Sequence, residues 1–144
     1  YTCMVAPYMI DSAHPLCGVN GVFNGIFLHG NALGDAMFYG SGAGKLPTAS
    51  AVVADVVDMA RHQHTNIYID WKPEKLTLVS YDDSVNRFFV RTDSPKEEVE
   101  KIFGNVSYVE NVVDGEYGFT TEAMAEKDFA AKADKINVIN RIRL

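Results

Sequence analysis

The chain has 144 residues, of which 47% are hydrophobic and 22% charged, the balance of an ordinary soluble globular protein. Its formal net charge of -6 offers no basic surface for phosphate backbones, which argues against nucleic-acid binding. No apolar run approaches the roughly 20 residues of a membrane span. The two cysteines, Cys3 and Cys17, form no CxxC pair and have no obvious histidine partners, so we expect reduced thiols without a disulfide or metal site.

The first element that the sequence predicts is a β-hairpin. Residues 21–30 read as a strand with two alternating faces, one of them carrying Val22, Asn24, Ile26 and Leu28. Residues 31–35 have turn chemistry, and residues 36–40 return as a second strand. We therefore expect an antiparallel pair.

A glycine cluster and a helix follow the hairpin. Residues 40–44 read Gly-Ser-Gly-Ala-Gly, and Pro47 suits the first turn of a helix. Apolar residues then recur with helical spacing, with Asp55, Asp58 and Arg61 turned away from them. The stripe consists of Ala49, Val52, Val53, Val56, Val57 and Ala60. This spacing predicts an amphipathic helix.

The chain changes character near residues 71–84, which read as a connection, and we place a boundary near residues 82–86. Beyond it we expect strands over 86–92, 106–113, 116–121 and 136–144. Ile136 and Val138 of the last strand should point inward, with Ile142 as a further candidate. Asp114-Gly115 is a tight-turn dipeptide between the second and third strands.

Two helices should separate these strands. The first would have Asp93 or Ser94 as its cap, Pro95 at its first position and Gly104 as its stop. The second is alanine-rich and covers residues 123–135. The resulting β-α-β-β-α-β order is typical of the ferredoxin-like split βαβ pattern, which hosts many functions.

The glycine cluster is the most suggestive chemical feature. Glycine allows a close approach of backbone to a ligand, and the following helix would point free N–H groups at a phosphate, ribose or carboxylate. Tight packing alone explains such a turn equally well. The cluster does not fit the P-loop pattern, because Tyr39 and Leu46 occupy required positions, nor the dinucleotide fingerprint, which needs glycine at Lys45.

No catalytic constellation is visible. His14, His29, His62 and His64 show no spacing that pairs them with carboxylates on one predicted face. Asp35, Asp55 and Asp58 are interpreted as surface carboxylates, and no Ser-His-Asp or Cys-His arrangement can be argued. The first half therefore resembles a surface that faces a ligand without performing chemistry.

Three segments resemble motifs of the homoserine dehydrogenase family. Residues 14–24 are similar to its HPLAxVxGVFNA, residues 34–44 to its GDxMFYGxGAG, and residues 46–55 to its LPTASAVVxD. Together they cover roughly residues 7–61 in one order with family-like spacing. From Arg87 onward the chain is similar to the family's C-terminal ACT-like domain, more loosely.

The resemblance implies a cytoplasmic, NAD(P)-dependent oxidoreductase that interconverts L-homoserine and L-aspartate 4-semialdehyde on the route to threonine, isoleucine and methionine. It also implies an α+β fold. Residues 1–82 would end the catalytic and dimerisation domain with antiparallel strands and a helix, and residues 83–144 would form a βαββαβ ACT-like domain. The chain would then be a C-terminal fragment without the dinucleotide-binding domain and the main catalytic residues, and inactive alone.

The resemblance further places the glycine segment near the nicotinamide end of NADP or NAD. Gly42, Gly44 and Thr48 are therefore the expected cofactor-binding residues, and Gly44 is the strongest single candidate because it lies nearest the helix. Catalytic and metal-binding residues are not expected in this chain. The implied partners are the small-molecule substrate and a second copy in a homo-oligomer, with no nucleic acid and no membrane.

The alternative is an ACT-type regulatory module that binds an amino acid or drives oligomerisation. Ligand-binding ACT domains carry a glycine in a D-x-P-G-like turn after their first strand. Here the corresponding loop, residues 92–97, reads Thr-Asp-Ser-Pro-Lys-Glu and has no glycine. A structural or subunit-pairing role is therefore at least as well supported as effector binding.

Overall fold

The computed structural model describes residues 1–66 and 68–144, with the side chains of residues 110–112 excepted. The chain forms two compact units. The C-terminal unit comprises Tyr1–Met9 and Glu74–Leu144, and the hairpin unit comprises Ile10–Pro73. The chain therefore crosses between units twice, after Met9 and after Pro73. The predicted domain boundary between residues 82 and 83 stays a prediction.

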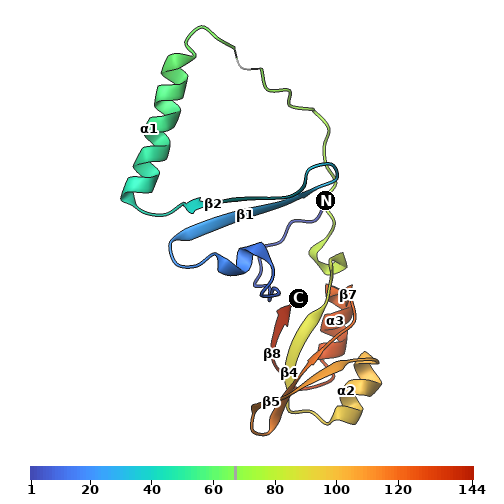
Figure 1. Cartoon of the computed structure of the whole chain (residues 1–144). Coiled ribbons are helices and arrows are strands. Elements are labelled where there is room, and N and C mark those ends of the chain that lie inside the picture. Colours follow the sequence, from blue (N-terminus) through green and yellow to red (C-terminus); the bar gives the residue numbers. More distant parts are fainter. Residues whose placement is uncertain (67) are drawn as a thin grey trace. The chain divides into compact units, whose positions relative to one another are not determined.

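The hairpin unit contains the predicted strand pair (Figure 1). Strands β1 (Phe23–Gly30) and β2 (Gly34–Ser41) pair antiparallel along their whole length, from Phe23 opposite Ser41 to Gly30 opposite Gly34. Gly34 closes the turn with a φ of 71°, a backbone conformation that glycine adopts without steric cost. The hairpin prediction is confirmed.

A short 3-10 helix, η1 (Pro15–Gly18), packs on one face of this hairpin. Gly25 makes the packing possible, because a Cβ there would lie 2.7 Å from Cδ2 of Leu16. The opposite face leaves Ile26 and Leu28 exposed. Every described residue of the hairpin unit is at least partly exposed, so this unit has no closed core of its own.

The predicted amphipathic helix is α1 (Lys45–Arg61). None of its residues is buried. Its valine stripe is exposed. Among the residues that the structure describes, no helix is both long and apolar enough to cross a membrane.

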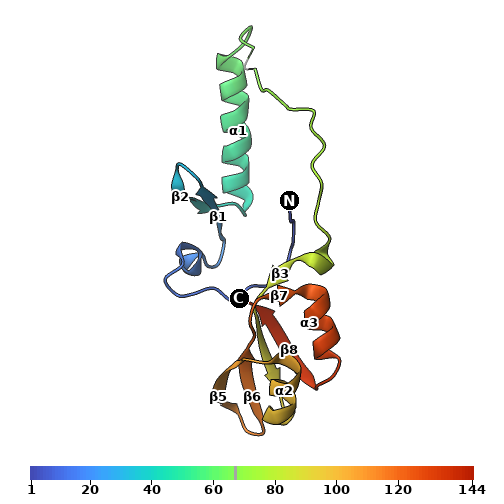
Figure 2. The same ribbon diagram turned by 90° about the vertical axis from the view of Figure 1, so that its right-hand side faces the viewer.

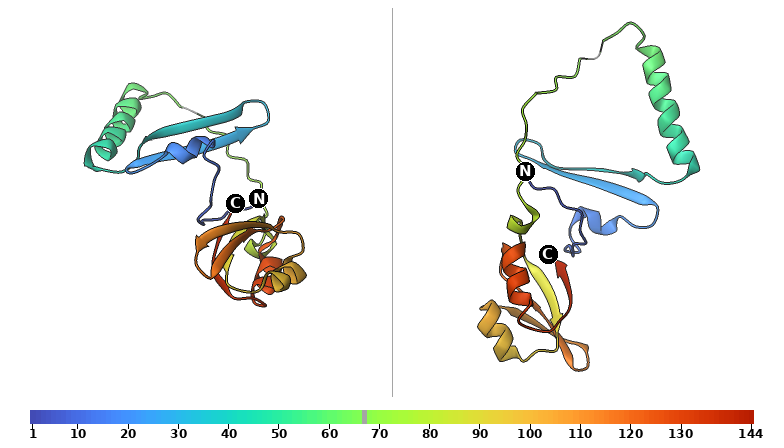
Figure 3. Two further views of the ribbon diagram at one scale, coloured as in Figure 1. Left: turned by 60° about the horizontal axis from the view of Figure 1, so that its bottom comes forward. Right: turned by 180° about the vertical axis from the view of Figure 1, so that it is seen from behind.

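The C-terminal unit contains a four-stranded antiparallel sheet in the order β5-β6-β4-β8. The strands are β4 (Phe88–Thr92), β5 (Ser107–Val113), β6 (Glu116–Thr120) and β8 (Val138–Arg143), and the helices are α2 (Lys96–Phe103) and α3 (Glu126–Ala133). Figure 2 and the left view of Figure 3 show both helices on one face of the sheet. This arrangement confirms the predicted βαββαβ order.

Three small elements complete this unit. The strands β3 (Val85–Asn86) and β7 (Met124–Ala125) form a two-residue antiparallel pair, and η2 (Tyr81–Asp83) precedes β3. Because Met124 and Ala125 pair with β3, the helix predicted from residue 123 begins only at Glu126.

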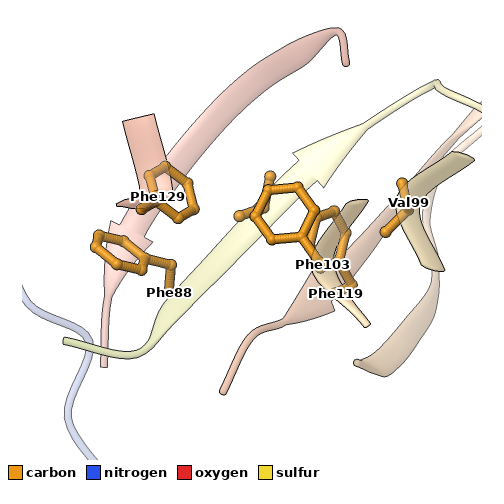
Figure 4. Close-up of a cluster of buried hydrophobic side chains, with 6 residues drawn as sticks. Phe88, Val99, Phe103, Phe119 and Phe129 are labelled. Atoms are coloured by element: carbon orange, nitrogen blue, oxygen red, sulfur yellow. The ribbon is translucent and has the colours of Figure 1, made fainter. Parts of the chain in front are cut away.

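The core lies between the sheet and the two helices. Alternate residues of β4, namely Phe88, Val90 and Thr92, are fully buried, as expected for a strand with one covered face. The rest of the cluster comes from Val99 and Phe103 of α2, Phe119 of β6 and Phe129 of α3. Figure 4 shows the rings of Phe88 and Phe129 together, with centroids 3.9 Å apart.

The predicted cap of α2 is wrong. The N-cap is Pro95, and no side chain caps the helix. The hydroxyl of Ser94 instead accepts a hydrogen bond from the Asn137 N–H at 2.9 Å, and the Asp93 carboxylate accepts one from the Asn137 side-chain amide at 2.8 Å. Both side chains therefore bind Asn137, the residue before β8. The predicted stop at Gly104 is confirmed, with a φ of 78°.

The inward placement of Ile142 is also wrong. The register between β4 and β8 shifts, so that Thr92 lies opposite Val138 while Arg91 lies opposite Asn140. The extra residue on β8 reverses the side-chain alternation beyond Val138. Ile142 consequently lies opposite the half-exposed Phe89, whereas Ile136 and Val138 do pack against the core.

Candidate functional site

The glycine segment connects the end of β2 at Ser41 to the start of α1 at Lys45. Gly44 is the N-cap of α1 and has φ 116° and ψ 154°. This region of backbone conformation is open essentially to glycine alone. Gly44 is therefore required by the local geometry, whatever ligand approaches it.

Packing against the hairpin also favours glycine at position 42. A Cβ built at this position would displace the side-chain amide of Asn24, an exposed residue of β1. Glycine thus lets the segment pass close to the hairpin. These two observations give the packing interpretation of the cluster a physical basis of its own.

The first turn of α1 nevertheless keeps free donors. The Thr48 N–H donates to the Gly44 carbonyl at 3.1 Å, and Pro47 has no N–H. The N–H groups of Lys45 and Leu46 have no acceptor among the described residues, no side chain caps the helix, and its first turn carries no acidic residue. Two N–H groups and the positive end of the helix dipole can therefore receive an anionic or polar group.

The predicted site residues Gly42, Gly44 and Thr48 thus lie within one turn and its helix start, where Thr48 is exposed. Their proximity follows from the chain sequence and needs no long-range contact. The free N–H groups at the start of α1 can donate hydrogen bonds to a ligand at this segment. Within the described residues, no group of three or more His, Cys, Asp or Glu side chains could hold a metal ion.

The expectation that no histidine pairs with a carboxylate is wrong. His29 Nδ1 lies 2.5 Å from Asp35 Oδ1, and these residues face each other across the hairpin. His62 Nδ1 lies 3.3 Å from Asp58 Oδ1, one helical turn away. All four side chains are exposed by roughly half or more, so these are surface pairs and not catalytic dyads. The strand register and the i,i+4 spacing could have predicted both.

A second polar cluster, which sequence reasoning missed, surrounds Glu126 in the C-terminal unit. The carboxylate is only 3% exposed and accepts hydrogen bonds from Arg143 Nε at 2.5 Å and Arg143 Nη2 at 3.0 Å. Tyr81 and Asn86 each donate a further bond at 3.0 Å. We call these four residues the Glu126 cluster.

Two opposing effects act on the pKa of Glu126. Desolvation by burial raises it and is the largest single influence, but the hydrogen bonds from Arg143 and Tyr81 and the charges of Arg143 and Arg141 together outweigh it. The pKa is consequently lowered from its ordinary value. The cluster is therefore a buried ion pair whose polar atoms have partners.

The loop between β4 and α2 is closed by its own hydrogen bonds. Thr92 Oγ1 donates to the Asn137 carbonyl at 2.6 Å and accepts from the Ser94 N–H at 3.1 Å. Tyr117 donates to the Ser94 carbonyl at 2.6 Å. Together with the bonds from Asn137 to Ser94 and Asp93, these contacts occupy the polar groups that a loop ligand would use.

Comparisons with known proteins agree with the fold. The sequence profile of the homoserine dehydrogenase family matches residues 1–57. The homoserine dehydrogenase of Lactococcus lactis is 34% identical over 94 residues, 63% of this chain and 22% of that protein. The homoserine dehydrogenase of Synechocystis is 56% identical over 55 residues, 38% of this chain and 13% of that protein.

Solved structures cover more of the chain. A homoserine dehydrogenase from Thiobacillus denitrificans superposes with a TM-score of 0.78 at 26% identity, covering 99% of this chain and 38% of that one. The homoserine dehydrogenase of S. aureus, at pH 7.0, gives a TM-score of 0.62 at 25% identity over 92% of this chain and 35% of that one.

These matches indicate the class of protein: an α+β chain similar to the C-terminal region of an oxidoreductase. Over residues 1–57 the chain is similar to the homoserine dehydrogenase family. It spans about a fifth of the length of the Lactococcus relative.

Proposed function

We propose that this chain is the C-terminal part of an NAD(P)-dependent homoserine dehydrogenase, which interconverts L-homoserine and L-aspartate 4-semialdehyde in the cytoplasm. The single observation that carries the proposal is the family match over residues 1–57, which includes the whole glycine segment and most of α1. The proposed domains are residues 1–82, ending the catalytic domain, and residues 83–144, an ACT-like domain.

The proposed role of the glycine segment is to face the nicotinamide end of NADP or NAD. The donor set fits such a polar group, because the N–H groups of Lys45 and Leu46 are available and the first turn carries no carboxylate that would repel it. The cofactor, when bound, supplies hydride transfer. Gly42, Gly44 and Thr48 would bind and orient it, and the proton chemistry would be left to residues outside this chain.

The first test uses the 144-residue chain itself. We expect no measurable oxidation of homoserine with NAD or NADP, because the dinucleotide-binding domain and the proton-handling groups that the family resemblance implies are not among these residues. The full-length enzyme that contains this sequence should turn over under the same conditions. Turnover by the 144-residue chain, free of host enzyme, would refute the proposed division of labour.

The second test addresses Thr48 in the full-length enzyme. Thr48→Val keeps the side-chain shape and removes the hydroxyl, and we expect the cofactor KM to rise by about tenfold, the worth of one hydrogen bond of about 1.4 kcal/mol. Ser50→Ala, a hydroxyl removed from the same exposed helix two residues further on, is the matched control and should leave KM unchanged. Equal kinetics for both variants would show that the Thr48 hydroxyl does not bind the cofactor.

The alternative function, an ACT-type module that binds an amino acid, finds less support. The β4–α2 loop lacks the expected glycine and is closed by bonds among Thr92, Ser94, Asn137 and Tyr117. A free amino acid would have to break several of these bonds to enter. A role of the C-terminal unit in subunit pairing is compatible with the closed loop. The exposed apolar side chains of β1, β2 and α1 support the proposed homo-oligomer.

A further inference from the structure

Two segments connect the C-terminal unit to the rest of the chain: residues 1–9 lead out of it and residues 74–84 lead back. Within the C-terminal unit the two segments run together. The N-terminal amine of Tyr1 donates to the Thr77 carbonyl at 3.1 Å, and the Val79 N–H donates to the Tyr1 carbonyl at 2.8 Å. We call them the outgoing segment and the returning segment.

The Glu126 cluster holds the returning segment through Tyr81. The Tyr81 hydroxyl donates to Glu126 Oε2 at 3.0 Å and also accepts from Arg143 Nη2. Arg143 in turn binds Glu126 through Nε. Tyr81 therefore contacts both members of a buried ion pair, whose side chains are 3% and 11% exposed.

The same carboxylate holds the outgoing segment through one intermediate. Asn86 donates from Nδ2 to Glu126 Oε1 at 3.0 Å, and its Oδ1 accepts from the Tyr8 hydroxyl at 3.0 Å. The Met9 N–H also donates to the Arg143 carbonyl at 2.7 Å, where the outgoing segment lies beside β8. Both segments are therefore hydrogen-bonded to the Glu126–Arg143 pair, the returning segment directly through Tyr81 and the outgoing segment through Asn86 and the Met9 N–H.

The bulge in β8 explains how Arg143 comes to be there. The register shift places Arg143 opposite the buried Phe88, so its side chain lies on the helix side of the sheet, where α3 begins with Glu126. Removing the carboxylate would leave the guanidinium, the Tyr81 hydroxyl and the Asn86 amide without their shared acceptor in a dry site, which is costly.

We propose that Glu126 acts as a latch: one buried carboxylate fixes both connecting segments on the C-terminal unit, so that both are released together when it is lost. The latch differs from an ordinary salt bridge because its partners belong to segments far apart in the sequence. It also differs from the nearby Lys127–Asp83 pair, 2.6 Å apart, whose side chains are both more than half exposed.

The test is amide hydrogen exchange of the full 144-residue chain and its variants. In Glu126→Gln we expect exchange to rise by about tenfold in both segments, residues 1–9 and 77–84, while β6 keeps its protection. Lys127→Met is the matched control, since it removes the exposed neighbouring pair, and should leave both segments unchanged. Unchanged exchange of both segments in Glu126→Gln overturns the proposal.

Two milder variants separate the branches of the latch. Tyr8→Phe should raise exchange at Met9, whose N–H binds the Arg143 carbonyl, and leave residues 82–84 unchanged. Tyr81→Phe should raise exchange in residues 82–84 and leave Met9 unchanged. Loss of amide protection in β6 would show that Glu126→Gln unfolds the whole unit. In that case Tyr8→Phe and Tyr81→Phe test the proposal. Selective release of each segment supports the latch, and its absence in both variants overturns it.

Discussion

At the scale of single residues, Glu126 and Arg143 show how an ion pair can be accommodated in a small unit. Burial of a lone carboxylate is unfavourable, but here Arg143 binds both of its oxygens, and Tyr81 and Asn86 supply one further donor each. Replacing one partner therefore costs more than replacing an exposed charge, typically about 3–5 kcal/mol against 0–1 kcal/mol.

The lowered pKa of Glu126 predicts a pH dependence of stability. Because the folded-state pKa lies below the ordinary value of 4.5, the ionised carboxylate contributes its full stabilisation above that pH and loses it as the pH falls through the folded-state pKa. The charged groups around it are Arg143 and Arg141 on β8, and Tyr81 on η2 also faces it. The free energy of unfolding, measured by urea titration, should therefore fall below about pH 4.5 more steeply for the wild type than for Glu126→Gln. Parallel pH profiles would contradict this assignment.

Gly44 predicts an effect that needs no cofactor. Gly44→Val in the 144-residue chain forces a branched residue to a φ of 116°, at a cost of about 1–3 kcal/mol, so α1 should fray at its start. Circular dichroism should register a loss of helix relative to the wild type and to Ser50→Ala. Unchanged helicity would show that the segment accommodates valine without strain. A loss of cofactor affinity in the full-length Gly44→Val enzyme would then be due to lost contact with the ligand and not to a disrupted helix.

At the scale of elements, periodicity and turn chemistry predicted most of the fold. The hairpin, α1 and the βαββαβ order followed from alternating or helical apolar spacing, and Gly104 ended α2 as expected. These features are local, because each depends on residues within one or two turns. The glycine segment was found for the same reason, together with a family resemblance over the same residues.

Features that depend on distant residues escaped prediction. Ser94 is recruited by Asn137 instead of capping α2, and the β8 bulge turns Ile142 outward and Arg143 inward. The burial of Glu126 requires partners from η2, β3 and β8, which no local pattern in the sequence brings together. Each of these outcomes is decided by tertiary contacts that override local preference.

The α3 element carries a direct test of the core. Phe129 is fully buried and its ring lies against Phe88, so Phe129→Ala should destabilise the C-terminal unit by about 3–5 kcal/mol. The urea midpoint, followed by the far-ultraviolet signal, measures the loss. Val109→Ala, at an exposed position of β5, is the control and should shift the midpoint little. Similar shifts for both variants would mean that the aromatic cluster is not the main source of stability.

At the scale of the whole molecule, the two units differ in how much they bury. The C-terminal unit has a closed aromatic core, whereas the hairpin unit leaves apolar side chains of β1, β2 and α1 in contact with solvent. The exposed residues are Ile26, Leu28, Phe38, Val52, Val53, Val56 and Val57. A two-stranded hairpin and a single helix are marginal by themselves in water, so these surfaces favour further association.

We therefore predict that the chain forms a dimer or higher oligomer at micromolar concentration, through its exposed strand pair and the valine stripe of α1. Val53 and Val56 are 59% and 53% exposed, and replacing both with glutamate should shift the population toward monomer by placing charge on the stripe. Asp55→Asn, on the polar side of the same helix, is the control and should leave the mass unchanged. Light scattering measures the outcome: a clean 15.9 kDa monomer for the wild type would refute the prediction.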